Sequence, residues 1–325
     1  MKIGVVGGGA WGTALAQTAA AKGPVTVWAR EPEVVEAVNR SHENPLFLAD
    51  VALDERIAAT GELDELAEGD ALLVVTPAQH MRGVLGSMPR LDIPLVLCSK
   101  GIEEESGDLL HKVAREAQPE APLAVLSGPT FAHEVAKGLP AAVTLAAEDR
   151  KLAERLRSRL ARRNFRLYLS DDLAGAEIGG AVKNVLAIAC GVVEGMGLGQ
   201  NARAALISRG FAEMTRFGLA HGARAETLAG LSGLGDLVLT CTSSSSRNFS
   251  LGKGLGEGRP AAELLADRRT VAEGAFTAPV LRRVARAADV EMPIVEAVCD
   301  LLSGAVSAEG AVEALLSRPL REEGL

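Results

Sequence analysis

Residues 2–30 read KIGVVGGGAWGTALAQTAAAKGPVTVWAR, and this stretch decides the fold of the first part of the chain. Residues 2–6 form a short, apolar, β-branched run, which is typical of a buried strand. Residues 13–22 have the composition of a helix, and a glycine–proline pair directly after them can end it. A second β-branched run follows at 25–28. The predicted order is therefore strand, glycine-rich turn, helix and strand.

The turn itself, GGGAWG at residues 7–12, has the spacing G-x-G-x-x-G at Gly7, Gly9 and Gly12. In this pattern Gly7 makes a tight turn, Gly9 lets a pyrophosphate approach the backbone, and Gly12 lets the helix pack closely on the strand. The N-terminus of the helix presents free N–H groups and a partial positive charge to phosphates. The spacing alone also fits an ordinary glycine turn. Its place between a strand and a helix predicts a dinucleotide site.

Three residues near this turn bear on the cofactor. Ala10 and Trp11 lie within the turn, before the predicted helix, and the tryptophan fits helix packing as well as a cofactor contact. Arg30 ends the second strand, where NAD-specific proteins usually carry an acidic residue for the ribose 2′-hydroxyl. An arginine can accommodate a 2′-phosphate instead, although Glu31 follows it and a solvated surface arginine fits the position too. We expect NADP to be accepted, without excluding NAD.

Length, composition and charge limit the class of protein. A chain of 325 residues, of which 48% are hydrophobic, can form two domains with sizeable cores. A net charge of −8 gives no basic footprint for nucleic acid. The four cysteines lack C-x-x-C spacing and no signal-peptide pattern is seen, so we expect reduced thiols in a cytoplasmic protein. The histidines are scattered, and we assign no metal; the apolar run 184–193 is too short to insert into a membrane.

The first half of the chain alternates strands and helices, which is typical of a parallel sheet covered on both faces. Strands are expected at 71–75, 93–98, 123–126, 141–146 and 165–169, and helices at 31–40 and 150–161. After residue 170 the strand signals fade, and helical stretches are expected at 174–194, 202–221, 278–288 and 295–303. We predict an α/β Rossmann-type dinucleotide-binding domain with a mostly parallel sheet at 1–170, and an all-helical substrate-binding domain at 171–325.

In open α/β sheets, ligands bind beyond the carboxyl ends of the strands. Segments marked by glycine, serine or proline follow predicted strands at 7–12, 76–77, 99–101 and 127–130. These segments are therefore expected to converge on one crevice. Lys100 lies in one of them, although a lysine on the surface of a loop would give the same pattern.

Several polar residues of the second half are candidates for chemistry. Lys183 lies inside an otherwise apolar helix; burial disfavours the charged form of a lysine, which suits a general acid or base. A lysine that snorkels from the helix edge explains the position equally well. Asp236, in the apolar and glycine-rich segment LSGLGDL, is a candidate partner or a simple turn residue. Ser246, Arg247 and Asn248 together suit a phosphate, although plain linkers also contain such runs.

Seven motifs occur in one order along the chain: GGGAWG (7–12), SKG (99–101), SGPTFA (127–132), GGAVKN (179–184), LSGLGDL (231–237), SRN (246–248) and VAEG (271–274). Together they resemble the bacterial NAD(P)-dependent sn-glycerol-3-phosphate dehydrogenases, of the 6-phosphogluconate dehydrogenase-like superfamily. The resemblance covers nearly the whole chain. Where members often read Asn…Tyr-Leu-Pro, this chain has NPLFLA at 44–49, so we transfer no role to that loop.

The resemblance implies that dihydroxyacetone phosphate and sn-glycerol 3-phosphate are interconverted by hydride transfer with NAD(P)H, in phospholipid biosynthesis. It gives Lys183 the role of proton donor and acceptor, Lys100 that of polarising the carbonyl, and Asp236 that of holding Lys183. Matches to the family's substrate-contacting positions are Lys100, Gly128, Thr130, Asp236, Ser246, Arg247 and Asn248. Matches to its cofactor-contacting positions are Trp11, Arg30, Lys100, Ala132, Arg247, Val271 and Glu273.

Two other functions remain open at this point. Another dehydrogenase of the superfamily, of the 3-hydroxyacid dehydrogenase or ketopantoate reductase type, would share the glycine turn and Lys183. A non-catalytic dinucleotide sensor would need the turn but no converging Lys100, Lys183 and Asp236. The expected partner is a phosphorylated small molecule, and the apolar second half also allows a homodimer.

Overall fold

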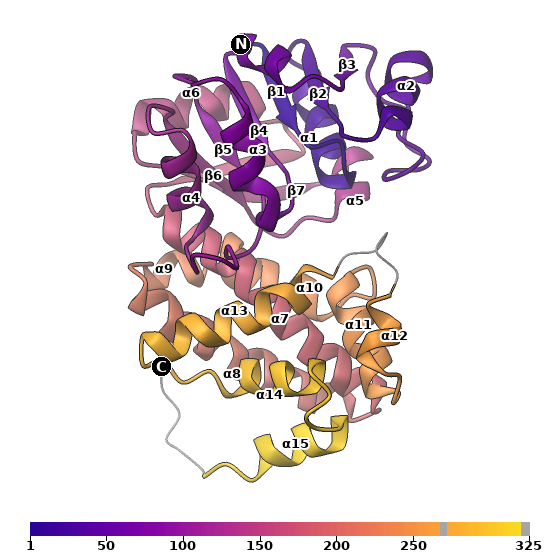
Figure 1. The fold of residues 1–325 in the computed structure, drawn as a ribbon, viewed down its shortest axis with the longest axis vertical. Helices are drawn as coiled ribbons and strands as arrows, with labels where there is room; N and C mark the ends of the chain where they lie inside the picture. The colour runs from indigo at the N-terminus through magenta and orange to yellow at the C-terminus, as the bar shows by residue number, and fades with distance from the viewer. Residues whose placement is uncertain (267–271, 320–325) are drawn as a thin grey trace. The chain divides into compact units, whose positions relative to one another are not determined.

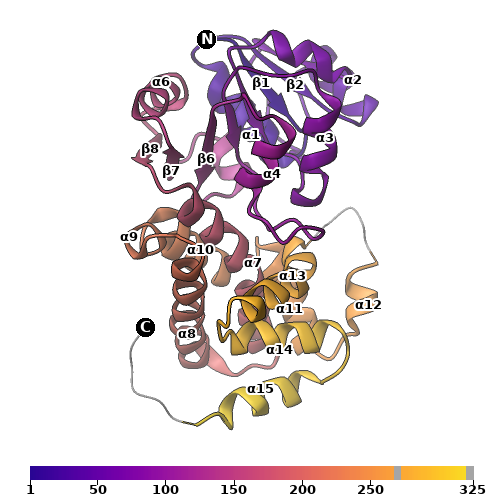
Figure 2. The same cartoon turned by 60° about the vertical axis from the view of Figure 1, so that its left-hand side comes forward.

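The computed structural model describes residues 1–266 and 272–319, which form two compact units labelled by element in Figures 1 and 2. The first unit comprises residues 1–100 and 109–176, and the second comprises residues 101–108 and 177 onward. The short segment 101–108 therefore belongs by its contacts to the second unit, although strands of the first unit lie on either side of it in sequence. The domain boundary after residue 170, drawn from sequence character alone, stays a prediction.

The first unit is built on one eight-stranded sheet with the order β3-β2-β1-β4-β5-β6-β7-β8. Its strands are β1 (Ile3–Val6), β2 (Val25–Trp28), β3 (Ile57–Thr60), β4 (Ala71–Val74), β5 (Leu95–Leu97), β6 (Leu123–Ser127), β7 (Ala141–Ala147) and β8 (Phe165–Ser170). Every neighbouring pair is parallel except β6 and β7. The predicted mostly parallel α/β sheet is confirmed.

Helices cover both faces of this sheet, which is why its central strands are apolar on both sides. Side chains of α1 (Ala10–Ala20), α2 (Pro32–Ser41), α5 (Ala132–Ala136) and α6 (Arg150–Leu160) share one buried cluster with the strands. Side chains of η1 (Leu63–Glu68), η2 (Ala78–His80), α3 (Met81–Ser87) and α4 (Leu110–Ala117) share the other. Val5 and Leu73 point into the first cluster, while Val6 and Leu72 point into the second.

The described part of the second unit is helical. After α7 (Leu173–Gly195), whose first residues belong to the first unit, come α8 (Gly199–Ala220), α9 (Ala225–Leu228), η3 (Leu231–Gly235), α10 (Asp236–Cys241), α11 (Arg247–Gly256), α12 (Ala261–Leu264), α13 (Glu273–Ala287), α14 (Pro293–Leu302) and α15 (Ala308–Leu316). The predicted helical character after the sheet is confirmed. Helix α7 is long and apolar enough to cross a membrane, but its apolar window is entirely buried within the protein, so it is a core helix.

Two pairs of glycines bring α7 and α11 into backbone contact. A Cβ atom at Gly191 would lie 2.1 Å from the Phe249 carbonyl oxygen, and one at Gly252 would lie 1.9 Å from the Ile188 oxygen. One turn further along, Cβ atoms at Gly195 and Gly256 would lie 2.2 and 2.4 Å from backbone oxygens of α11 and α7. Any larger side chain at these positions would push the two helices apart. The contact fixes α11, and with it residues 246–248, relative to the face of α7.

The predicted elements agree with the structure where an apolar run is short and bounded by turn residues, as at β2. The short elements β3, α3 and α4 were not predicted, and neither were α9 to α12 and α15. Each of these has four to ten residues, and such lengths give too few turns for a period to be visible. Helix α1 begins at Ala10 rather than residue 13, because the last glycine of the turn is already helical.

One buried carboxylate of the second unit joins two helices. Glu213 of α8 is 2% exposed, and its Oε1 and Oε2 atoms accept hydrogen bonds from the Ile294 and Val295 N–H groups at 2.7 and 3.4 Å. It thereby caps the N-terminus of α14 from a neighbouring helix. Burial raises the pKa of Glu213 from 4.5 to about 7, against the effect of these two hydrogen bonds.

Glu213 should make the stability of the fold depend on pH. Because its pKa is raised in the folded state, the free energy of unfolding should fall as pH rises from about 4.5 to about 7, by roughly 3 kcal/mol. Glu213→Gln keeps an oxygen for the Ile294 N–H and removes the charge, so it should lose this dependence. Urea unfolding at pH 5 and pH 8 tests this, with exposed Glu263→Gln as the control. The same pH slope in Glu213→Gln as in the parent chain would contradict it.

Candidate functional site

The glycine turn lies between β1 and α1, at the carboxyl end of the strand. Gly7 has φ of +128°, and its N–H group donates to the Trp28 carbonyl at 3.1 Å, which ties the turn to β2. A Cβ at Gly12 would lie 1.9 Å from the Gly7 oxygen, so only glycine allows the helix to start this close to the strand. At Gly9, by contrast, a Cβ would meet nothing within 4 Å. The open space at Gly9, beside the N-terminus of α1, fits a pyrophosphate.

Asn44, from the loop to which no role was given, holds this turn in shape. Its side chain is completely buried, and its Nδ2 atom donates to the Gly8 carbonyl and to Thr13 Oγ1, each at 2.8 Å. Its Oδ1 atom accepts from the Phe47 N–H at 3.2 Å, which closes the loop on itself. Gln17 of α1 forms a second link to this loop, where it accepts from the Asp54 N–H at 2.8 Å. The carbonyl of Gly8 is thus fixed from behind the turn.

Arg30, Trp11 and Ala132 differ in how far the structure supports a cofactor contact. The side chain of Arg30 is 78% exposed, at the end of β2, and donates to Glu31 Oε1 at 2.8 Å. Trp11 packs partly buried against the core, and its Nε1 has no hydrogen-bond partner in the described residues. Ala132 begins α5, which packs against α1. Arg30 is therefore available beside the turn, whereas the contacts of Trp11 are those of a packing residue.

Two further strand ends of the first unit meet at one carbonyl group. Lys100 Nζ, after β5, donates to the Gly128 oxygen at 3.4 Å, and Thr130 Oγ1 donates to the same oxygen at 3.3 Å. A Cβ at Gly128 would lie 2.9 Å from the Val143 Cα, so this position is restricted to glycine by close packing. The predicted convergence of strand ends therefore brings together Lys100, Gly128 and Thr130. All three lie in the unit that carries the glycine turn.

Lys183 lies on α7 as part of a buried ion pair in the second unit. Its Nζ atom is 2.5 Å from Asp236 Oδ1 and donates to Thr240 Oγ1 at 3.0 Å. The side chain of Lys183 is 7% exposed, and that of Asp236 is completely buried. Thr240 in turn donates to the Asp236 carbonyl at 2.6 Å, so the three groups form one network. The alternative of a lysine snorkelling from the helix edge is excluded by this burial and pairing.

A π-helical turn, η3, precedes Asp236 and determines where its side chain points. Such turns are rare and often occur at functional sites. The turn packs tightly, because a Cβ at Gly233 would lie 1.9 Å from the Leu228 oxygen, and one at Gly179 of α7 would lie 2.2 Å from the Ser232 oxygen. This close packing holds the start of α10 against α7. The tightly packed backbone of this turn therefore positions the Asp236 side chain next to Lys183.

The residues of the SRN motif form the N-terminus of α11. Ser246 is the N-cap, with its Oγ accepting from the Phe249 N–H at 3.2 Å, and Arg247 is exposed. Asn248 is buried; its Nδ2 donates to Asn184 Oδ1 at 3.0 Å, and its Oδ1 accepts from the Gly274 N–H at 2.9 Å. Asn248 therefore ties α11 to α7 and α13. Serine, arginine and a helix N-terminus together fit an anionic group.

Two predicted cofactor residues remain, Val271 and Glu273. Glu273 is the first residue of α13. Val271 lies outside the described residues. The roles predicted for both stay predictions.

Comparison with known proteins identifies the family of this chain. Models of the N-terminal and C-terminal parts of NAD-dependent glycerol-3-phosphate dehydrogenase match residues 2–153 and 172–313. A glycerol-3-phosphate dehydrogenase (NAD(P)+) of Erythrobacter litoralis is 64% identical over 99% of this chain and 98% of its own length. This chain belongs to the NAD-dependent glycerol-3-phosphate dehydrogenase family.

Solved structures agree with this membership. The crystal structure of glycerol-3-phosphate dehydrogenase from Coxiella burnetii matches with a TM-score of 0.93 and 37% identity, over 98% of this chain and 99% of that one. A ketopantoate reductase of Ralstonia eutropha matches with a TM-score of 0.60 and 13% identity, over 97% of this chain and 100% of that one. The second likeness shows a shared fold alone. Of the two dehydrogenase types considered, the glycerol-3-phosphate dehydrogenase family is thus the one supported.

Within this family member, sequence reasoning missed Thr240 and Asn44. Thr240 could have been found, because it lies four residues after Asp236 and therefore on the same face of a helix. Asn44 had no such signal, since an asparagine before a proline usually belongs to a local turn. Here its side chain instead reaches a carbonyl 36 residues away in sequence.

Asn44 should be needed for tight cofactor binding. Asn44→Asp is nearly isosteric but replaces both N–H donors by an acceptor, which would face the Gly8 carbonyl and distort the turn. We expect NADPH affinity to fall by about tenfold or more, corresponding to the loss of at least one buried hydrogen bond. Fluorescence titration measures it. Asn39→Ala removes two hydrogen bonds to Ala59, away from the turn, and should leave this affinity nearly unchanged; an equal loss in both variants would contradict the role.

Proposed function

We propose that the chain carries out the reaction of its family with Lys183 as the proton donor and acceptor, interconverting dihydroxyacetone phosphate and sn-glycerol 3-phosphate. The observation that carries this assignment is the buried network of Lys183, Asp236 and Thr240. A non-catalytic dinucleotide sensor would have no need for a charged pair buried beside a phosphate-binding helix end. The predicted cytoplasmic location and the homodimer stay predictions.

The cofactor would be held by the first unit. The diphosphate would lie over Gly9 and the first N–H groups of α1, at Ala10 to Gly12, where the backbone is open and the helix dipole favours an anion. Arg30 would lie beside the adenosine ribose; it can accommodate a 2′-phosphate, although Glu31 competes for its guanidinium. When bound, the reduced nicotinamide supplies the hydride that adds to C2 of the substrate.

The phosphate of the substrate would be held at the N-terminus of α11. Ser246 and Arg247 stand in the first turn of this helix, and Asn248 fixes that turn to α7. Arg247 forms no ion pair in the described residues, so its guanidinium fork is available for a phosphate. Lys100, with Gly128 and Thr130, would act at the carbonyl and adjacent hydroxyl of the substrate.

Lys183 would transfer the proton. During reduction of the ketone, negative charge develops on the C2 oxygen, and the Lys183 ammonium donates a proton to it and becomes neutral. In the opposite direction the neutral amine takes the proton from the C2 hydroxyl. Asp236 and Thr240 hold Nζ in place throughout, and the carboxylate stabilises the ammonium form in a buried setting.

Lys183→Met should abolish turnover without affecting the cofactor. Methionine has a similar length but carries no proton, so kcat should fall by at least ~100-fold, the low end for general acid catalysis. The affinity for NADPH should stay within about twofold, because the glycine turn belongs to the other unit. The control is Lys253→Met, which replaces an exposed lysine of α11 and should leave the activity unchanged.

The lost charge could also destabilise the fold, because Asp236 would remain buried without a partner. The double variant Lys183→Met, Asp236→Asn removes the unpaired charge and should recover thermal stability while remaining inactive. Recovery of kcat in either variant would show that the proton comes from another group, and Lys100 would be tested next.

Arg247 should bind the phosphate of the substrate. Arg247→Ala is expected to raise KM for dihydroxyacetone phosphate by about tenfold or more, since a hydrogen bond to a charged group is lost. Turnover of unphosphorylated dihydroxyacetone should hardly change. Arg259→Ala, a surface arginine paired with Glu263, serves as the control. An equal loss with both substrates, at unchanged cofactor affinity, would contradict phosphate binding by Arg247.

A further inference from the structure

Four arginines surround one hollow at the edge of the sheet in the first unit. The hollow has a volume of about 400 Å³, and its walls include Arg150 and Arg157 of α6, Arg162, and Arg166 of β8. The ring of Tyr168, half exposed, forms part of the wall, with the Arg166 guanidinium 5.7 Å from its centre. This volume lies within the range of small-ligand pockets.

The positive charge around this hollow is only partly balanced. Eight of the residues at 150–166 are basic and one is acidic, in a chain whose net charge is −8. Arg150 pairs with Glu154 at 3.0 Å, and Arg162 donates to carbonyl groups of α1. Arg157 and Arg166 are exposed and form no ion pair in the described part of the chain. Burial and the charges of Arg159 and Arg56 lower the pKa of Arg162, as expected where cations are crowded.

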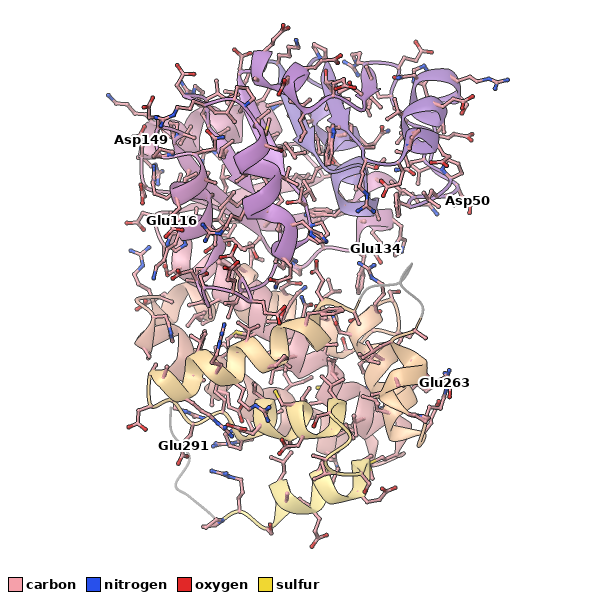
Figure 3. All side chains as sticks on the ribbon, in the orientation of Figure 1. Asp50, Glu116, Glu134, Asp149, Glu263 and Glu291 are labelled. Atoms are coloured by element: carbon pink, nitrogen blue, oxygen red, sulfur yellow. The ribbon has the colours of Figure 1, made fainter. Side chains whose placement is uncertain are left out.

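This position is separate from the site of the cofactor. β8 is the last strand of the sheet and lies five strands from β1, roughly 24 Å away at the usual spacing between strands. Arg162, in the wall of the hollow, donates to the Thr18 carbonyl near the C-terminal end of α1, whereas the glycine turn lies at the N-terminal end of that helix. Asp149, labelled in Figure 3, caps the N-terminus of α6, where its side chain accepts hydrogen bonds from the Lys151 and Leu152 N–H groups.

We propose that this hollow is a second anion site, which takes a phosphate group carried by a small ester or by a lipid headgroup. Guanidinium forks bind phosphate oxygens in pairs, and Arg157 and Arg166 supply two that form no ion pair with the residues described by the structure. The ring of Tyr168 offers a flat apolar surface for the organic part of such a molecule. The opposing interpretation is that the arginines only protect the open edge of β8 from pairing with another strand.

Isothermal titration of the full chain, with the active site filled by NADP+ and dihydroxyacetone phosphate, tests the proposal. The probes are inorganic phosphate, adenosine monophosphate and phosphatidylcholine vesicles with or without phosphatidylglycerol. Arg157→Gln, Arg166→Gln is the test variant. Arg155→Gln, Arg163→Gln is the matched control, because these two arginines are also exposed but do not line the hollow. All four substitutions are at the surface and should leave the fold intact.

We expect at least one phosphate-bearing probe to bind, with affinity at least about tenfold weaker in the test variant and nearly unchanged in the control. Binding of adenosine monophosphate or phosphate would identify a soluble ligand, and binding of phosphatidylglycerol vesicles alone would identify a lipid headgroup. The absence of binding by every probe would overturn the proposal. An equal loss of probe affinity in the test and control variants would also overturn it. Such a result would show general attraction to the positive surface charge rather than a defined binding site.

Discussion

The second unit depends on one buried ion pair, between Lys183 and Asp236. Two isolated charges in a protein interior cost several kcal/mol each, and only close pairing with further hydrogen bonds offsets this. The pair has both, because the two groups lie 2.5 Å apart and Thr240 adds a third member to the network. The glycines of α7 and η3 allow this pairing because they let the two backbones approach closely. A larger residue at Gly179 would separate the lysine from the carboxylate.

In the first unit, the turn before α1 is stabilised by side chains that lie on the side away from the start of the helix. In the proposed function the N–H groups at the start of the helix bind the cofactor, so they do not stabilise the turn before it. Asn44 and Gln17 stabilise it from the other side, through the Gly8 carbonyl and the backbone of the loop. The proposed binding surface remains open because these two side chains contact the turn and the loop from the other side. This explains why a loop with no visible pattern in the sequence carries a completely buried asparagine.

The sequence predicted what depends on local patterns. The apolar runs of β1, β2 and β4, the glycine spacing and the long apolar helix α7 all follow from neighbouring residues, and all are present. The pairing of Lys183 with Asp236 could be suggested, because a buried lysine requires a partner. The function of Asn44 could not, since it depends on where a loop returns in space. The antiparallel placement of β7 was likewise beyond sequence reasoning, because a β-branched run does not encode its direction.

The C-terminal ends of α1 and α6 are each capped by basic side chains from the other segment. Arg159 donates to the Ala19 carbonyl at 2.6 Å, and Arg162 donates to the Thr18 carbonyl, so the end of α6 caps α1. Lys22, just beyond α1, donates to the Ser158 and Ala161 carbonyls at 2.6 and 2.8 Å and so caps α6 in return. A cation near a helix C-terminus contributes about 0.3–1 kcal/mol through the helix dipole. These side chains satisfy the negative end of α1, and the proposed cofactor site lies at its opposite, positive end.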